Sequence, residues 1–276
     1  MRFASVIHDE KPHAVAVDGQ AALPLTGIAE LGAETPVDVL RDPPLDRDAA
    51  FAVGEATVRP LIPRPGKVIC VGLNYKAHVE ETNRDLPDYP VLFTKFAGSL
   101  TGAYDTVMCP PESDAVDYEG ELAVVIGRPA RRVSPAQALE AVAGYTVAND
   151  VTMRDYQYRT HQWLQGKAWD ASTPLGPALV TPDEVCDPGA LTLRTLVNGD
   201  VVQEAGTELM IFSVPTLISV ISEFATLQPG DVILTGTPAG VGFRRDPQHL
   251  MGDGDVAVVE IEGVGRTENR FATEMV

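Results

Sequence analysis

The chain has 276 residues, 45% of them hydrophobic, so it can bury a core of its own. Its 21 basic and 39 acidic side chains give a formal net charge of −18, which repels nucleic acid and anionic lipid, and we expect neither as a partner. No run approaches the roughly 18 apolar residues of a membrane helix, and the N-terminus has no secretory pattern. Three widely spaced cysteines fit neither a disulfide framework nor a Cys-x-x-Cys site, which favours a reducing, cytoplasmic location.

The first 60 residues predict a small β-rich appendage. Residues 2–18 are typical of two strands around a turn, because small and apolar side chains alternate on both sides of a charged Asp-Glu-Lys-Pro sequence. A short helix is expected near residues 26–32. Proline-rich and charged sequence follows, and we predict that residues 59–66 link the appendage, 1–60, to a main domain, 61–276.

The remaining chain predicts more strands than helices. Apolar runs predict strands at residues 67–73, 91–96, 122–126, 145–149, 232–235 and 256–261. Asn198-Gly199 joins two further strand-like runs, 191–197 and 201–204, and is typical of a type I′ hairpin turn. Capping residues predict helices at 136–143 and 213–225. Strands and helices do not alternate regularly, so the sequence favours a β-rich α+β fold over a Rossmann sheet or a TIM barrel.

Three carboxylates stand at the ends of predicted strands. Glu119 and Glu121 are two residues apart, so on a strand their side chains point to the same face about 7 Å apart. Gly120 between them lets the backbone approach a neighbour closely. Asp150 ends another apolar strand. Hard oxygen ligands without cysteine or clustered histidine favour Mg²⁺, Mn²⁺ or Ca²⁺, whereas the alternative is a solvated acidic strand end.

Cationic groups follow Asp150 along the chain. Arg154 lies four residues on, and Gln157 and Lys167 come after it. A guanidinium and an ammonium beside a metal can hold a substrate carboxylate, the guanidinium through a bidentate fork. Taken singly, each of these groups is equally compatible with a surface ion pair.

The polar segment 74–90 is either a mobile loop or a short helix. Within it, His78 and Glu81 are three residues apart and would face each other on one helical turn. A glutamate beside a histidine fixes the tautomer and increases the basicity of the imidazole, which makes a general base for water. The alternative is a helix ion pair on the surface.

A glycine-rich turn, residues 234–242, follows a predicted strand. It matches neither the dinucleotide fingerprint nor a Walker loop, since no Lys-Ser/Thr pair follows its glycines, and we predict no nucleotide. The turn offers backbone N–H groups and the Thr237 hydroxyl to a carboxylate or an enolate oxygen. It is equally compatible with a purely structural strand exit.

Several of these segments, in this order, resemble the fumarylacetoacetate hydrolase family. The resembling segments are residues 71–81, 117–123, 149–157, 166–167, 174–177, 198–199 and 233–238. The resemblance implies a β-rich roll of mixed sheets, a homodimer, and a small N-terminal region of the kind many members carry. Two stretches depart from it: residues 158–165, with His161 and Trp163, match no defined role, and residues 171–173 stand where an aromatic is common.

The resemblance also implies site residues. It implies one Mg²⁺ or Mn²⁺, with Ca²⁺ as an alternative, held by Glu119, Glu121 and Asp150. It implies catalytic roles for His78, Glu81 and Lys167, the first two on a lid that closes over substrate, and substrate contacts for Arg154, Gln157 and Thr237.

The implied activity is hydrolysis of a C–C bond in a 3-acylpyruvate-type 2-oxo acid, such as a fumarylpyruvate or acylpyruvate. The metal would hold the small 2-oxo carboxylate and stabilise the departing enolate, while His78 activates water. Decarboxylation of oxaloacetate, or isomerisation or hydration of a hydroxymuconate-type dienoate, is the alternative at the same site. A non-catalytic metabolite-binding protein is a further alternative, which the paired His78 and Glu81 disfavour.

Overall fold

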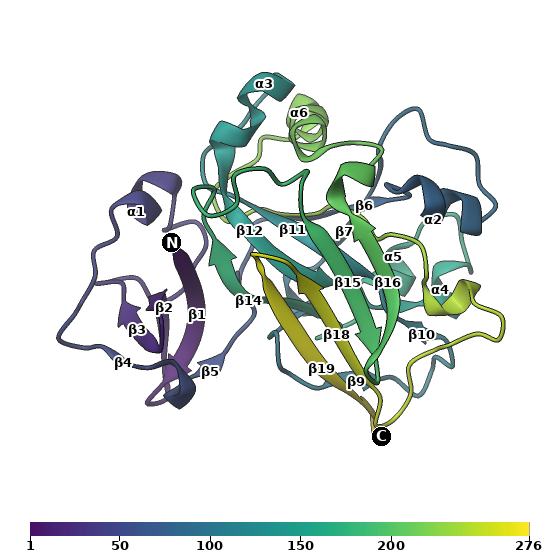
Figure 1. The fold of residues 1–276 in the computed structure, drawn as a ribbon, viewed down its shortest axis with the longest axis horizontal. Helices are drawn as coiled ribbons and strands as arrows, with labels where there is room; N and C mark the ends of the chain where they lie inside the picture. Colours follow the sequence, from purple (N-terminus) through teal and green to yellow (C-terminus); the bar gives the residue numbers. More distant parts are fainter. Residues whose placement is uncertain (276) are drawn as a thin grey trace.

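The computed structural model describes residues 1–275 and is dominated by strands. Within those residues there is one twelve-stranded sheet, one five-stranded sheet and one two-stranded ribbon (Figure 1). Parallel and antiparallel pairs occur together, because β17 pairs with β6 in parallel and most other neighbours are antiparallel. The predicted fold, an α+β roll of mixed sheets, is confirmed.

The large sheet runs through the whole molecule. Its main path, in spatial order, is β4 (Phe51–Ala52), β3 (Ala21–Pro24), β2 (Lys11–Asp18), β1 (Arg2–His8), β14 (Thr173–Val180), β12 (Val142–Asn149), β11 (Gly120–Ile126), β17 (Val232–Leu234), β6 (Val68–Gly72) and β7 (Val91–Lys95). Off this path, β5 (Thr57–Val58) pairs with β1 and β8 (Leu100–Thr101) with β14. The strands predicted at 2–18, 67–73, 91–96, 122–126, 145–149 and 232–235 all belong to this sheet.

The second sheet packs across β11 and β12. Its order is β16 (Asp200–Gly206), β15 (Thr192–Val197), β18 (Val256–Ile261), β19 (Gly265–Thr273) and β9 (Val107–Cys109), and β10 (Val116–Asp117) with β13 (Thr152–Met153) forms the separate ribbon. The predicted hairpin is confirmed, since Asn198 and Gly199 take the positive φ values of 52° and 92° that a type I′ turn requires. Leu193 and Val259 from this sheet share one buried cluster with Leu122 from β11.

The helices are short except for one. They are α1 (Val37–Arg41), α2 (Lys76–Glu81), α3 (Pro135–Ala138), α4 (Arg154–Gln157), α5 (Leu164–Lys167) and α6 (Val214–Phe224), with 3₁₀ turns at Val53–Glu55, Ala97–Ser99, Leu139–Ala141, Thr207–Leu209 and Gly242–Arg244. The helix predicted at 213–225 is confirmed as α6, which buries Leu217, Ile218 and Ile221 in the core. Among residues 1–275, no helix has the length and apolar character that crossing a bilayer demands.

Two helix predictions are wrong. Residues 26–32 form turns rather than a helix, because Gly27 and Gly32 adopt φ values of 76° and 154° that no α-helix contains. The helix predicted at 136–143 ends early as a 3₁₀ turn, and β12 already begins at Val142. Gly144 is therefore a strand residue rather than a helix end; a Cβ there would lie 2.5 Å from the Val180 carbonyl oxygen of the adjacent strand.

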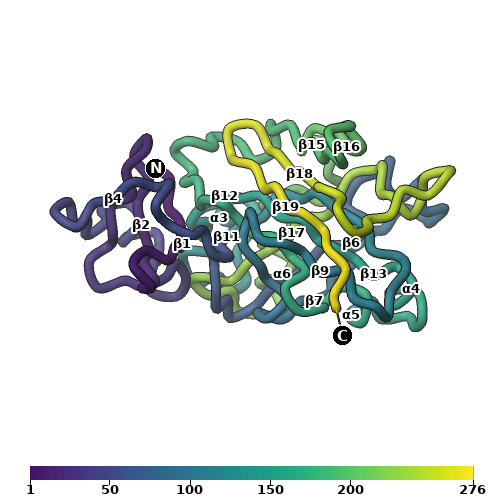
Figure 2. The backbone as a smooth tube through the Cα atoms, turned by 90° about the horizontal axis from the view of Figure 1, so that it is seen from below, coloured from purple at the N-terminus to yellow at the C-terminus, as the bar shows by residue number. Residues whose placement is uncertain are grey.

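The N-terminal region is joined to the rest by backbone pairing and by apolar contact. It lies at one end of the molecule in both views (Figures 1 and 2). Strand β1 pairs with β14 through Arg2 with Val180 and Phe3 with Leu179. Phe3 and Leu179 belong to one buried cluster that also includes Val125 of β11. The division into domains at residue 60 stays a prediction.

Candidate active site

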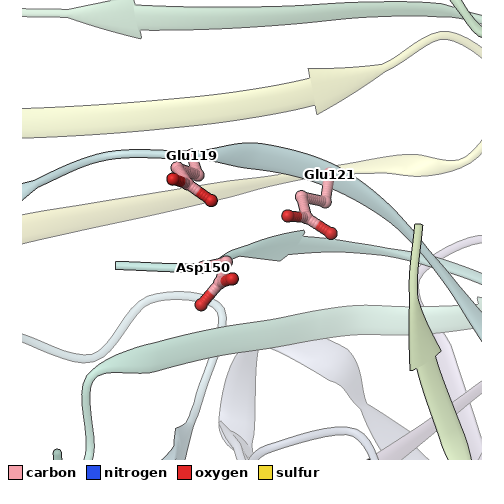
Figure 3. A group of neighbouring side chains, drawn as sticks. All are labelled: Glu119, Glu121 and Asp150. Atoms are coloured by element: carbon pink, nitrogen blue, oxygen red, sulfur yellow. The ribbon is translucent and has the colours of Figure 1, made fainter. Parts of the chain in front are cut away.

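The three carboxylates predicted from the sequence meet at one end of the large sheet. Glu119 precedes β11, Glu121 lies on it, and Asp150 follows β12. These strands are antiparallel neighbours, so the start of one lies beside the end of the other. One oxygen from each side chain lies within 4.8 Å of the other two, and all three residues are buried. Figure 3 shows both glutamates projecting from one strand toward Asp150.

Gly120 explains why both glutamates turn the same way. A Cβ at this position would lie 2.2 Å from Thr195 Oγ1 and 3.0 Å from Val259 Cγ1, both in the second sheet. The second sheet therefore packs directly on the backbone between the glutamates. Because the second sheet covers one face of the chain at Gly120, the side chains of Glu119 and Glu121 lie on the opposite face, next to Asp150.

The pKa values of the two glutamates shift in opposite directions. Burial alone raises the pKa of Glu119, but Lys167 and Arg154 outweigh it and the pKa falls to about 2. For Glu121, burial and then the charges of Asp150 and Glu119 raise the pKa well above its usual value. The three buried carboxylates thus repel one another, and a bound metal ion relieves this repulsion.

Two buried lysines contact the carboxylates. Lys167 Nζ lies 2.6 Å from Glu119 Oε2 and 2.8 Å from Asp150 Oδ2. Lys95 Nζ, on β7, lies 2.7 Å from Asp150 Oδ1 and donates to Thr173 Oγ1 at 2.7 Å. The sequence analysis missed Lys95, although a lysine inside a predicted apolar strand was the available signal. Its side chain is fully buried, so solvent screens its charge little.

Arg154 connects the carboxylates to the pocket. Its Nε donates to Asp117 Oδ2 at 2.8 Å, and its Nη1 lies 2.7 Å from Glu119 Oε1 and 3.0 Å from Gln157 Oε1. The remaining nitrogen, Nη2, is buried and has no hydrogen-bond partner among residues 1–275. A buried donor without a partner is costly, so this N–H group is available for a ligand. Asp117 is a second residue that sequence analysis did not single out.

The carboxylate cluster fits a hard divalent cation. Asp150 Oδ1 contacts Lys95 without the geometry of a hydrogen bond, and within residues 1–275 it accepts no hydrogen bond. Glu121 Oε2 accepts one hydrogen bond, from the Gly236 N–H at 2.7 Å. Three carboxylates with free acceptor capacity form an all-oxygen donor set, which suits Mg²⁺ or Mn²⁺ and not a thiolate-binding metal. These residues therefore fit the predicted ion.

The predicted histidine–glutamate pair forms on α2. His78 Nδ1 lies 2.6 Å from Glu81 Oε1. The other oxygen of Glu81 accepts the Gly240 N–H at 2.9 Å, so the pair is docked on the glycine-rich turn. The sequence left a mobile loop and a short helix as alternatives for residues 74–90, and the structure has a short helix at Lys76–Glu81.

The glycine-rich turn has a supporting residue that the sequence did not reveal. Thr237 Oγ1 accepts a hydrogen bond from Gln203 Nε2 at 2.8 Å, and Gln203 Oε1 accepts the Gly120 N–H at 3.1 Å. Gln203 is buried on β16 and thereby links the turn to the backbone between the glutamates. Nothing in its local sequence distinguishes it from an ordinary strand residue.

One pocket collects most of the predicted site residues. It is lined by His78, Glu119, Arg154, Gln157, Lys167 and Thr237, together with unpredicted aromatic and basic side chains of Arg84, Phe93, Tyr158, Trp163, Phe243 and Arg244. Trp163 packs edge-on against Phe93 with ring centroids 5.7 Å apart. The segment 158–165, which matched no role in the sequence, therefore forms part of the pocket wall.

Comparison with known proteins identifies the family. The model of the fumarylacetoacetate (FAA) hydrolase C-terminal domain matches residues 67–272, which is most of the chain. The chain belongs to the fumarylacetoacetate hydrolase family. The resemblance found in the sequence is thus confirmed, and its matching segments all lie within the matched range.

Curated relatives from this family include enzymes named for oxaloacetate. The human protein named mitochondrial oxaloacetate tautomerase FAHD2A is 49% identical over 218 residues, which is 78% of this chain and 69% of the human protein. The rat mitochondrial oxaloacetate tautomerase is 48% identical over 210 residues, which is 76% of this chain and 67% of that protein. These relatives are mitochondrial by name, and the cytoplasmic location of this chain stays a prediction.

Solved structures of the family share the whole fold. A fumarylacetoacetate hydrolase from Exiguobacterium antarcticum superposes with a TM-score of 0.87 at 35% identity, covering 99% of this chain and 100% of that one. A 5-carboxymethyl-2-hydroxymuconate delta-isomerase from Mycobacterium smegmatis gives 0.84 at 34% identity, with coverage of 99% and 100%. The chain is therefore an enzyme of this family, whose members bear the names of more than one reaction.

Proposed function

We propose that this enzyme interconverts the enol and keto forms of a small 2-oxo acid of the oxaloacetate type, with one Mg²⁺ or Mn²⁺ at Glu119, Glu121 and Asp150. The observation that carries the proposal is one pocket lined by Glu119 of the carboxylate cluster, by a guanidinium with a free N–H group, and by His78 of the histidine–glutamate pair. Nearly half of the matched residues are identical to those of proteins named oxaloacetate tautomerases.

Arg154 is the residue that orients the substrate. Its Nη2 donates to the carboxylate next to the 2-oxo group, which fills the hydrogen bond that this buried nitrogen lacks. Gln157 fixes the guanidinium from the other side through Nη1. The cation, when bound, supplies Lewis-acid chemistry that stabilises negative charge on the 2-oxo oxygen.

His78 is the residue that moves the proton. Glu81 occupies Nδ1, which leaves Nε2 to face the pocket that His78 lines. In the ketonising direction the imidazolium gives a proton to carbon 3 of the enol, and the imidazole regains one as the enol hydroxyl is deprotonated. Both forms of the substrate have the same composition, so this exchange leaves no net gain or loss of protons.

Lys167 and Thr237 support the charge that develops on the substrate. Lys167 Nζ is held between two carboxylates at the pocket floor, and burial, which lowers its pKa, is outweighed by Asp150 and Glu119 so that the pKa is raised. It therefore stays positively charged through the reaction. The Thr237 hydroxyl accepts from Gln203 and keeps its own proton to donate to substrate oxygen.

The test follows the enol of oxaloacetate by its ultraviolet absorbance. We expect the enzyme with Mg²⁺ or Mn²⁺ to accelerate enol loss, and chelation with EDTA to remove the acceleration. A rate equal to that of the uncatalysed reaction in every metal condition would contradict the proposal.

Hydrolysis of an acylpyruvate is a second candidate activity. The His78–Glu81 pair favours it, because the same imidazole is placed to take a proton from a water molecule in the pocket. Acetylpyruvate and fumarylpyruvate would then release pyruvate, whereas a decarboxylase would release CO₂ from oxaloacetate and an isomerase would convert a hydroxymuconate-type dienoate. A panel of these four substrates separates the reactions by their products.

A further inference from the structure

Two arginines line the same pocket but take no part in the carboxylate cluster. Arg84 follows the helix that carries His78, and Arg244 ends the 3₁₀ turn after the glycine-rich segment. Both are exposed at the pocket rather than buried in it. Within residues 1–275, no carboxylate oxygen lies within 4.0 Å of either guanidinium, although the chain is strongly acidic.

Aromatic rings hold both guanidinium groups near the pocket. The Arg84 guanidinium carbon lies 5.6 Å from the centroid of Trp163. The Arg244 guanidinium lies 5.7 Å from the ring of Tyr158 and 5.6 Å from that of Phe243, and its Nη2 donates to the Tyr158 hydroxyl at 3.2 Å. Stacking of this kind orients an arginine while leaving most of its N–H groups free.

The net charge of the buried charged residues behind the pocket indicates a role for these two arginines. The centre contains four buried carboxylates and three buried cations: Asp117, Glu119, Glu121, Asp150, Lys95, Arg154 and Lys167. With a divalent cation bound, its net charge is one positive unit. One substrate carboxylate balances that charge, so a second carboxylate on the same molecule requires positive charge from elsewhere in the pocket.

We infer that Arg84 and Arg244 bind the second carboxylate of a 2-oxo dicarboxylate and select such substrates over 2-oxo monocarboxylates. The inference rests on the proposed function, because it presumes that the first carboxylate binds at Arg154. Guanidinium groups suit this role, since their planar N–H forks match a carboxylate. Because both arginines are exposed, the pair together contributes about tenfold in affinity.

The experiment compares two ligands of equal chain length. Oxaloacetate and 2-oxobutyrate each have four carbons and differ in whether the end distal to the 2-oxo group is a carboxylate or a methyl. Their dissociation constants are measured by titration calorimetry at low temperature in the presence of Mg²⁺. The proteins compared are the wild type and a double variant, Arg84→Gln with Arg244→Gln. Arg194→Gln, which removes an exposed arginine on β15, is the matched control.

We expect the double variant to bind oxaloacetate about tenfold more weakly and 2-oxobutyrate as the wild type does. Arg194→Gln should change neither affinity. Equal affinities of the double variant and the wild type for oxaloacetate, or an equal loss for both ligands, would overturn the inference. Absence of turnover in the wild type would instead count against the proposed function, because the comparison of affinities needs no reaction.

Discussion

The pocket has two unlike sides, a charged floor and a mixed wall. The floor is the buried charged centre, in which Glu119, Arg154 and Lys167 line the pocket and Lys95, Glu121 and Asp150 lie next to them. The wall consists of His78, Glu81, Arg84, Tyr158, Trp163, Phe243 and Arg244. Every floor residue is buried and is held by ion pairs or, for Glu121, by a backbone hydrogen bond. In contrast, Arg84, Tyr158 and Arg244 are exposed, and short helices and turns carry the wall.

This difference shows that the sheet determines the positions of the floor residues, whereas the wall residues lie on segments that can vary. The floor carboxylates are set by the pairing of β11 with β12, the centre of the large sheet. The wall can change shape without disturbing that pairing. The family structures named as a hydrolase and as an isomerase share this fold.

The largest expected effect comes from removing charge at one floor residue. Glu121→Gln should abolish Mn²⁺ binding and lower activity at least about a thousandfold, because the ligand set loses one anion. Burial, Asp150 and Glu119 raise the pKa of Glu121, which means that the metal-free fold disfavours its charged form, so the neutral variant should unfold no more easily than the wild type. Calorimetric Mn²⁺ titration and urea unfolding in EDTA measure both quantities. Retained Mn²⁺ affinity would remove Glu121 from the ligand set.

Removing a floor cation should affect stability. Lys95→Met keeps the side-chain length but leaves Asp150 without one of its two buried partners, and the free energy of unfolding should fall by at least about 3 kcal/mol. Lys76→Met is the matched control, since that exposed lysine pairs only with the exposed Glu80. Equal urea midpoints for the two variants would show that Lys95 does not stabilise the floor.

Acid should weaken the floor through Glu119. Its folded-state pKa is lowered from 4.5 to about 2, so its stabilisation is complete above pH 4.5 and is lost as the pH falls toward 2. The shift corresponds to about 3 kcal/mol. In EDTA, the wild type should therefore exceed Glu119→Gln in unfolding free energy near neutral pH, and the gap should close in acid. A gap that is independent of pH would contradict this assignment.

A wall variant should leave the floor intact. His78→Ala should lower kcat about a hundredfold, which is a typical contribution of a general acid–base group. Mn²⁺ affinity and the urea midpoint should stay near wild-type values, because within residues 1–275 the imidazole forms no hydrogen bond or ion pair with Glu119, Glu121 or Asp150. Glu80→Gln, which changes an exposed residue of the same helix, is the control for a general disturbance of α2. A parallel loss of Mn²⁺ binding would mean that wall and floor are one unit.

The floor was more predictable from the sequence than the wall. The i, i+2 spacing of Glu119 and Glu121 and the apolar strand before Asp150 follow local rules, and the structure brings the three together. Lys95 and Gln203 were missed, because their contacts come from residues more than 30 positions away. Burial of a polar side chain by distant elements leaves no local pattern.

Helix ends and strand partners were the weaker part of the fold prediction. The helix predicted to reach residue 143 stops early because Val142 and Gly144 belong to β12. Strand β14 approaches β12 so closely at Gly144 that there is no room for a side chain at this position. Strand β14 contains three turn-prone residues, Pro174, Gly176 and Pro177, and was not predicted. Tertiary pairing overrode local propensity in both cases.

The attachment of β1 to β14 has a practical consequence for expression. The family match begins at residue 67, which suggests a shorter recombinant protein. Such a truncation would uncover Leu179 and Val125, which are covered by the cluster containing Phe3, and would free the backbone of β14 at Val180. An unpaired strand edge beside an exposed apolar surface promotes aggregation with other chains. A recombinant protein that starts at residue 67 should therefore form inclusion bodies under conditions in which residues 1–276 give dissolved protein.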